Sequence, residues 1–179
     1  RVGDRVMSCK KNGTFADYFL SLEENLHPIP AEMDLELGSL GEPLACVMYS
    51  IFNSGVQPGD TVAVMGLGFA GQLMVQGAKK KGAVTVIGID PLAGKRDLAK
   101  KLGADRVFDP KIPDSEKAIL EVTKGAGVDV VFEAAGTEDS MNLATRILRK
   151  NGTLALYSWV MEPVRLNISR WHDDGMNIR

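Results

Sequence analysis

A short apolar strand that runs directly into a glycine-spaced turn constrains this sequence more than any other feature. Thr61–Met65 is rich in β-branched residues, and glycines follow at positions 66, 68 and 71, where a helical pattern opens. In such a turn the first glycine permits a tight bend, the second lets the backbone approach a pyrophosphate, and the third lets helix and strand pack closely. The helix N-terminus adds unpaired N–H groups. We therefore expect a dinucleotide-binding turn formed by Gly66, Gly68, Phe69, Ala70 and Gly71; the alternative is a structural turn without a ligand.

An acidic residue ends the next predicted strand. The pattern Val84–Ile89 predicts this strand, and Asp90 follows it, nineteen positions after Gly71. Dinucleotide folds place an acid at about this distance, where its carboxylate accepts hydrogen bonds from the adenosine ribose. A carboxylate there would repel the 2′-phosphate of NADP, so it favours NAD. The alternative role of Asp90 is a helix cap before Pro91.

Residues 61–157 alternate strand and helix patterns. The predicted strands are Thr61–Met65, Val84–Ile89, Arg106–Phe108, Val128–Phe132 and Thr153–Tyr157. The predicted helices are Gly71–Lys81, one that begins at Pro91 and ends before Gly103, one capped by Ser115 that ends before Gly125, and one capped by Thr137 that closes on Asn151 and Gly152. Continuous apolar strands between helices predict an α/β fold, a doubly wound parallel sheet covered on both faces. Ligands bind such sheets at the carboxyl ends of the strands.

The two ends of the chain differ from this pattern. Val2–Ser8 and Thr14–Leu22 are predicted to be strands of a mostly β structure, and Leu44–Phe52 is predicted to be a helix. The last residues, Met176–Arg179, have a strand-like pattern. We interpret the sequence as part of a longer protein.

Composition excludes several classes of function. The net charge is −2 with no basic block, which argues against nucleic acid as the main partner. Apolar runs are interrupted and no longer than a strand, so no membrane span is predicted. Cys9 and Cys46 are the two cysteines, too few for a disulfide framework or a four-cysteine zinc site. A reducing, cytoplasmic location fits this usage.

Several segments together resemble one protein family. They are 2–6 (VGDRV), 13–18 (GTFADY), 28–30 (PIP), 42–45 (EPLA), 58–60 (PGD), 66–71 (GLGFAG), 102–105 (LGAD), 129–136 (DVVFEAAG) and 151–154 (NGTL). Their order and spacing resemble the medium-chain dehydrogenase/reductases, and residues 42–44 resemble the zinc-dependent polyol and threonine dehydrogenases of that family.

The resemblance implies two domains and a chemistry. Residues 1–35 would end a GroES-like catalytic domain, and residues 36–179 would form most of a Rossmann domain with a truncated sixth strand. In this family zinc activates a bound alcohol and hydride passes to the nicotinamide. The implied cofactors are NAD and, in the complete protein, Zn²⁺; the implied substrate is a small alcohol or polyol, and homodimers or homotetramers are expected.

The resemblance also implies roles for particular residues. Glu42 lies 24 positions before Gly66, where the sorbitol dehydrogenase branch places a glutamate that faces the zinc; alternatively, it stabilises a helix N-terminus without metal. Lys95 would lie beside the adenosine, although Lys95 and Arg96 could also tolerate a 2′-phosphate. The remaining expected cofactor contacts, each of which could instead be simple packing, are Ala134, Ala135, Gly136, Tyr157 and Ser158. We assign no catalytic residue, and we expect Cys46 to be buried.

These observations lead to one functional hypothesis with two alternatives. The leading hypothesis is the NAD-binding portion of a zinc-dependent alcohol or polyol dehydrogenase, inactive without the rest of the protein. The first alternative is a zinc-free, NADPH-dependent quinone or enone reductase of the same superfamily. The second is a non-catalytic NAD-binding module.

Overall fold

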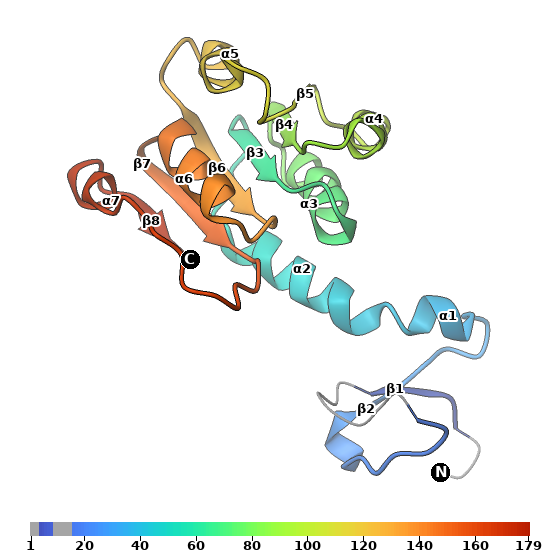
Figure 1. Ribbon diagram of the computed structural model, residues 1–179. Helices are drawn as coiled ribbons and strands as arrows, with labels where there is room; N and C mark the ends of the chain where they lie inside the picture. The colour runs from blue at the N-terminus through green and yellow to red at the C-terminus, as the bar shows by residue number, and fades with distance from the viewer. Residues whose placement is uncertain (1–3, 9–15) are drawn as a thin grey trace. The chain divides into compact units, whose positions relative to one another are not determined.

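Six parallel strands form a sheet in the order β5-β4-β3-β6-β7-β8 (Figure 1). The computed structural model describes residues 4–8 and 16–179 of the chain. The strands are β3 (Thr61–Met65), β4 (Thr85–Ile89), β5 (Arg106–Phe108), β6 (Val128–Glu133), β7 (Leu148–Leu156) and β8 (Asn177–Ile178). Since β4 and β5 lie on one side of β3 and the later strands on the other, the winding reverses at β3. This topology confirms the predicted doubly wound α/β fold.

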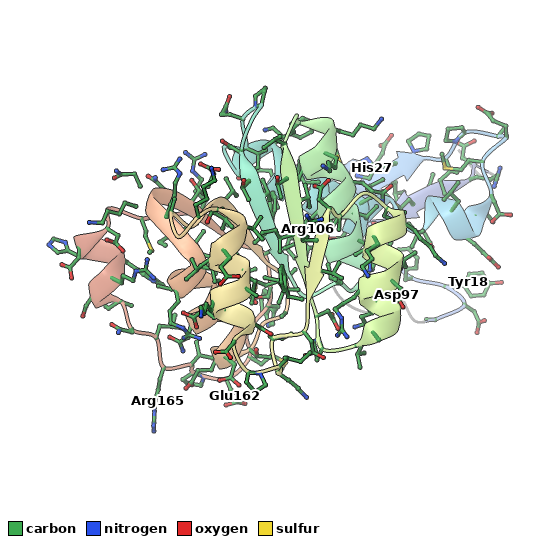
Figure 2. The ribbon with its side chains drawn as sticks, turned by 90° about the horizontal axis from the view of Figure 1, so that it is seen from above. Tyr18, His27, Asp97, Arg106, Glu162 and Arg165 are labelled. Carbon is green, nitrogen blue, oxygen red and sulfur yellow. The ribbon has the colours of Figure 1, made fainter. Side chains whose placement is uncertain are left out.

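Helices cover both faces of this sheet. They are α2 (Gly41–Asn53), α3 (Phe69–Lys80), α4 (Ala93–Lys101), α5 (Ser115–Val122), α6 (Glu138–Ile147) and the short α7 (Ser169–Asp173). Because side chains alternate along a strand, Val62 and Val64 pack with residues of α2, α3 and α4, whereas Ala63 and Met65 pack with residues of α5 and α6. Figure 2 shows Arg106 on the edge strand β5, next to α4 with Asp97.

The chain divides into two compact units, residues 1–46 and 47–179. In the first unit β1 (Val6–Ser8) pairs antiparallel with β2 (Leu26–Pro28), which follows a 3₁₀ turn, η1 (Glu23–Asn25). The short helix α1 (Leu35–Gly38) is capped by Asp34, whose side chain accepts a hydrogen bond from the Glu36 amide. The domain boundary expected between residues 35 and 36 stays a prediction. No helix in the described ranges is long and apolar enough to cross a membrane.

Two predicted strands of the first unit differ from the structure. In the segment Thr14–Leu22, residues 16–22 form no strand, and residues 14 and 15 lie outside the described residues. Tyr18 and Leu20 are about nine-tenths exposed, so the alternation of side chains here does not mark a face that packs against a core. In Val2–Ser8 the strand is limited to Val6–Ser8, while residues 2 and 3 are not described.

Side-chain hydrogen bonds shift the starts of two helices. The helix predicted to begin at Pro91 begins at Ala93, because the Asp90 carboxylate accepts a hydrogen bond from the Leu92 amide and holds residues 90–92 in a turn. Ser115 does not cap α5 but is its first residue, and its hydroxyl donates to the carbonyl of Asp109 at 2.6 Å. The cap residue of α5 is Asp114.

Local interactions also determine where helices α3 and α6 begin and end. Helix α3 begins at Phe69 rather than Gly71, because Gly68 already occupies the cap position. Helix α6 ends at Ile147 rather than at Asn151, because Leu148 pairs with Val128 and starts β7. The predicted Thr137 cap of α6 is present, as a capping box with Ser140.

Candidate functional site

The glycine turn lies at the carboxyl end of β3, and its three glycines have different surroundings. Gly66 has φ +84°, and a Cβ atom built on it would lie 2.8 Å from the Ala135 nitrogen. A Cβ on Gly71 would overlap the carbonyl oxygen of Gly66, so it must also be glycine for helix and strand to pack. A Cβ on Gly68 would meet nothing within 4 Å. Gly66 and Gly71 therefore shape the turn, and Gly68 leaves space open beside it.

Helix α3 presents free amides at this turn. Its first recorded backbone hydrogen bond runs from the Gln72 amide to the Gly68 carbonyl at 3.0 Å, and Gly68 has no side chain to cap the helix. Within the described part of the chain, the amides of Phe69, Ala70 and Gly71 have no recorded acceptor. Unpaired amides and the helix dipole favour an anion at this position.

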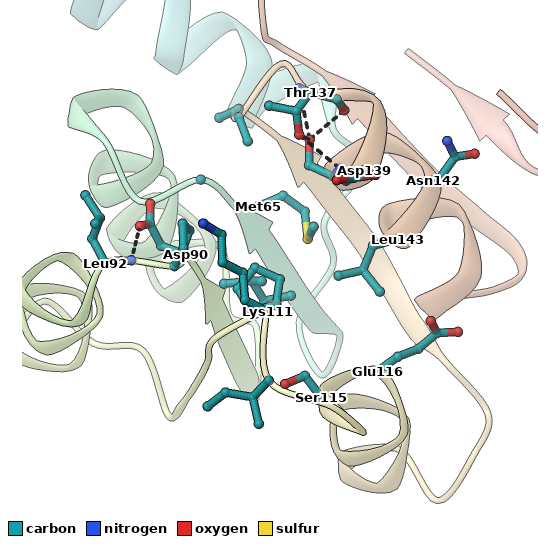
Figure 3. Close-up of a pocket in the computed structure, with 18 of the residues that line it drawn as sticks. Met65, Asp90, Leu92, Lys111, Ser115, Glu116, Thr137, Asp139, Asn142 and Leu143 are labelled. Atoms are coloured by element: carbon teal, nitrogen blue, oxygen red, sulfur yellow. Dashed lines mark hydrogen bonds between the residues drawn. The ribbon is translucent and has the colours of Figure 1, made fainter. Parts of the chain in front are cut away.

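The Asp90 carboxylate is buried next to the turn and is bonded to both of its neighbouring loops. Its Oδ2 accepts a hydrogen bond of 2.9 Å from the Leu67 amide, and its Oδ1 accepts one of 2.8 Å from the Leu92 amide (Figure 3). The residue is 5% exposed. Each carboxylate oxygen can accept a further hydrogen bond, so the group can still bind ribose hydroxyls. The sequence placed Asp90 correctly at the strand end but did not reveal its bonds to the loops.

Two cationic side chains lie near Asp90, and they differ in their hydrogen bonding and exposure. Arg96 donates to the Asp90 carbonyl at 2.7 Å and to Asp109 Oδ2 at 3.1 Å. Lys95 has a half-exposed side chain, and its Nζ lies 3.9 Å from Asp90 Oδ2. The Arg96 guanidinium is therefore engaged in hydrogen bonds within the protein. The Lys95 ammonium group, in contrast, is accessible to a ligand at the rim of the site.

A cavity of about 790 Å³ connects the glycine turn with Asp90 and continues between α5 and α6 (Figure 3). This volume is in the range of small-molecule and cofactor pockets. The predicted cofactor-binding residues that line it are Gly66, Gly68, Asp90, Lys95, Ala134 and Ala135. The loop after β5 supplies a wall that the sequence did not predict, formed by Pro110, Lys111 and Ile112.

The other predicted contacts lie beside this cavity rather than in its lining. Phe69, Ala70 and Gly71 form the start of α3. Gly136 and Ser158 are neighbours, because a Cβ on Gly136 would lie 3.2 Å from the Ser158 Cβ. The amides of Tyr157 and Ser158 both donate to the carbonyl oxygen of Glu133. The two loops after β6 and β7 are thus brought together, and their contact with a cofactor stays a prediction.

Sequence reasoning missed Glu133 as a separate site residue. It is the last residue of β6, its side chain is fully buried, and its carboxylate accepts hydrogen bonds from Ala135, Gly136, Ser140 and Ser158. The available signal was an acidic residue at the end of an otherwise apolar strand, in the segment 128–133.

The described residues do not form a metal site by themselves. Glu42 is exposed at the start of α2, where its Oε1 accepts a hydrogen bond of 3.3 Å from the Cys46 thiol. Cys46 is exposed rather than buried as expected, because it shares the open side of the helix with Glu42. No group of three or more possible ligands that could hold a metal ion occurs in residues 4–8 and 16–179. Glu42 could supply one zinc ligand, but the structure gives it no protein co-ligand set.

Comparison with known proteins identifies the family of this chain. Residues 70–179, more than half of the chain, match the family model described as zinc-binding dehydrogenase. The chain belongs to this family. A D-arabitol-phosphate dehydrogenase from Enterococcus avium is 37% identical over 145 residues, which are 80% of this chain and 41% of that protein. These matches confirm the resemblance found in the sequence.

Two further zinc-binding dehydrogenase relatives extend the comparison. A sorbitol dehydrogenase from Halalkalibacterium halodurans is 33% identical over 155 residues, covering 86% of this chain and 45% of that protein. A solved zinc-binding dehydrogenase from Sinorhizobium meliloti 1021, bound to NADP, is 33% identical with a TM-score of 0.79, covering 87% of this chain and 46% of that one. The chain spans less than half the length of these relatives.

Proposed function

We propose that this chain is the cofactor-binding portion of an NAD- and zinc-dependent polyol dehydrogenase. The observation that carries the proposal is the cavity in which the open space beside Gly68, the free amides of α3 and the Asp90 carboxylate lie together. The turn and the helix N-terminus would bind the pyrophosphate, and Asp90 would accept hydrogen bonds from the adenosine ribose. A bound nicotinamide supplies the hydride acceptor.

NAD is preferred to NADP in this proposal because of the charges around the ribose. The buried Asp90 carboxylate would repel a 2′-phosphate. Arg96, which could offset that repulsion, is already engaged by Asp109 and by the Asp90 carbonyl. Lys95 supports the competing candidate, an NADP-dependent enzyme, because its ammonium group is half-exposed near Asp90. The relative that was solved with NADP is a second reason to test that candidate.

The complete protein would supply the remaining parts of the reaction. Glu42 would face a zinc ion whose other ligands come from outside the described residues. The substrate would be a small polyol, since the names of two relatives specify arabitol phosphate and sorbitol. Residues 1–179 alone would show no turnover. The homodimeric or homotetrameric state and the cytoplasmic location stay predictions, as does the expectation of no nucleic-acid partner.

A fluorescence titration with NADH and, separately, with NADPH tests the proposal. We expect the protein to prefer NADH by about tenfold or more, and Asp90→Asn to weaken NADH binding by about tenfold, the value of one hydrogen bond to a charged group. Asp60→Asn is the matched control, because Asp60 also accepts a backbone amide hydrogen bond but precedes β3, at the opposite end of the strand. That variant should bind NADH normally.

Other results would favour the alternatives. Preference for NADPH would favour the zinc-free quinone or enone reductase, and so would metal analysis of the full-length protein that finds no zinc. Binding of NADH by a full-length, zinc-free protein that oxidises no alcohol would favour a non-catalytic module. Failure to bind either nucleotide would contradict the proposed function.

A further inference from the structure

A buried carboxylate at the carboxyl end of β6 has no cationic partner. Glu133 has no exposed surface, and no ion pair to it is recorded for the described residues. Burying a carboxylate costs free energy unless hydrogen bonds compensate it, and an apolar residue of similar size would avoid that cost. The hydrogen bonds of Glu133 therefore indicate what the carboxylate does.

All recorded donors to Glu133 belong to loops or to a helix start on the cofactor side of the sheet. Its Oε1 accepts from the amides of Ala135 at 3.1 Å and Gly136 at 3.0 Å, and from the Ser140 hydroxyl at 2.7 Å. Its Oε2 accepts from the hydroxyl of Ser158 and, at 3.3 Å, from the amide of Gly136. One carboxylate thus joins the loop after β6, the start of α6 and the loop after β7.

The backbone of the same residue strengthens this connection. The Glu133 carbonyl accepts hydrogen bonds from the Tyr157 amide at 3.0 Å and the Ser158 amide at 3.1 Å. The loop after β6 is also fixed on its other side, because Ala135 lies against Gly66 in the glycine turn. The spacing between the glycine turn and the two loops consequently depends on how Glu133 is bonded.

We propose that Glu133 is a positioning residue that holds residues 134–136 and 157–158 at the separation needed by the nicotinamide half of the cofactor. This inference rests on the proposed function. A pre-arranged site binds its ligand more tightly, because its loops are already ordered and lose little conformational entropy on binding. The adenosine half is held by Asp90 and the loop after β4, which Glu133 does not contact. Loss of the Glu133 hydrogen bonds should therefore weaken binding at one end of the cofactor.

Binding of NADH and of ADP-ribose to the full chain separates these two ends, because ADP-ribose lacks the nicotinamide. Ser158→Ala removes the one side-chain bond between Glu133 and the loop after β7. We expect it to weaken NADH binding about tenfold, the value of a hydrogen bond to a charged group, and to change ADP-ribose binding by less than about twofold. Glu133→Gln should bind NADH within about threefold of wild type, because its amide can donate to the Ser158 hydroxyl while its oxygen still accepts. Glu133→Ala should reduce the affinity for NADH more than Ser158→Ala does.

Thr145→Ala is the matched control. Thr145 is a buried residue of α6 whose hydroxyl donates to the Met141 carbonyl and accepts from the Trp171 indole N–H, and it has no recorded hydrogen bond to either loop. The Thr145→Ala variant should be less stable than wild type but should bind NADH and ADP-ribose with unchanged affinity. Equal weakening of NADH and ADP-ribose in Ser158→Ala, or no weakening of either, would overturn the positioning role and leave the proposed function standing. A wild-type protein that binds neither ligand would overturn both.

Discussion

The backbone of Ala135 lies so close to Gly66 that a side chain on Gly66 would meet the Ala135 nitrogen at 2.8 Å. The two residues follow neighbouring strands, β3 and β6, which pair in parallel with Met65 opposite Glu133. Gly66 also has φ +84°, a conformation that side chains disfavour. The turn that we propose for the pyrophosphate is thus fixed both by its own backbone and by the loop after β6.

Gly66→Ala should therefore destabilise the protein in two ways. The positive φ costs about 1 kcal/mol, and the contact with Ala135 adds about 1–3 kcal/mol because backbone atoms cannot move aside easily. Urea denaturation would measure the free energy of unfolding. Gly59→Ala is the control, since Gly59 has φ +95° but its Cβ would meet nothing within 4 Å. Equal losses in the two variants would show that the Ala135 contact is unimportant.

Gly68→Ala should reduce the affinity for NADH while leaving the stability of the protein almost unchanged. A Cβ at this position meets nothing within 4 Å and the residue has φ −73°, so the free energy of unfolding should change by less than about 0.5 kcal/mol. The methyl group would, however, occupy the space proposed for the pyrophosphate, and NADH affinity should fall about tenfold or more, because even small displacements at a fitted site are costly. Gly94→Ala, in α4 with equally open surroundings, should leave NADH affinity unchanged. Unchanged affinity in Gly68→Ala would place the pyrophosphate elsewhere.

The sequence predicted the order of the strands because most of them are apolar runs between helical patterns, but β7 begins at Leu148 rather than at the predicted Thr153. Thr61–Met65 and Arg106–Phe108 have the predicted bounds, and the helices between the strands occur in the predicted order. Helix starts were less predictable, because they depend on particular side-chain bonds such as that of Asp90 to the Leu92 amide. The alternation in Thr14–Leu22 was a misleading strand signal, since residues 16–22 form no strand and Tyr18 and Leu20 are almost fully exposed.

The candidate site also contains residues that the sequence could predict and residues that it could not. That Gly66 and Gly68 meet Asp90 was predictable, because in a strand–helix–strand unit the ends of two neighbouring parallel strands lie side by side. Glu133 was not, because its partners lie on three separate segments, and no sequence spacing reports that they meet. The cavity wall at Pro110 also depends on how the loop after β5 folds.

Asp105 gives the protein a local pH dependence. Burial raises the pKa of Asp105, but hydrogen bonds from Lys79 and the Val86 amide, together with the Lys79 charge, lower it below its ordinary value overall. A carboxyl whose pKa is lower in the folded state stabilises the protein fully above its unfolded pKa of about 3.9, and this contribution is lost as pH falls through the folded pKa. Acid therefore removes it.

Asp105→Asn should consequently be less stable than wild type at pH 7 and about equally stable near pH 2. The side chain is 39% exposed, so solvent screening limits the difference at pH 7 to about 1 kcal/mol. Chemical denaturation at both pH values would measure it. Lys79→Gln should show the same convergence in acid. A difference that persists at pH 2 would mean that the asparagine disturbs packing rather than removing a charge interaction.

Gly77 in α3 should behave unlike an ordinary helical glycine, because it allows α2 to approach closely. A Cβ on Gly77 would overlap Ile51 Cδ1 and lie 3.0 Å from its Cγ1. Gly→Ala in a helix interior usually gains about 0.5–1 kcal/mol. Here the overlap should reverse the sign and give a loss of about 1–3 kcal/mol, since Ile51 is buried and cannot move aside freely.

A double-mutant cycle tests this explanation of Gly77. Ile51→Ala alone should cost about 2–5 kcal/mol, because it leaves a cavity between the helices. In the double variant the new methyl group of Gly77→Ala partly fills that cavity, so the combined loss should be smaller than the sum of the two single losses by about 1–2 kcal/mol. Gly94→Ala combined with Ile51→Ala serves as the control and should be additive, because Gly94 has no neighbour within 4 Å. Additivity in the Gly77 cycle would mean that Ile51 adopts another rotamer to avoid the methyl group, and that the close approach of α2 and α3 does not depend on the glycine.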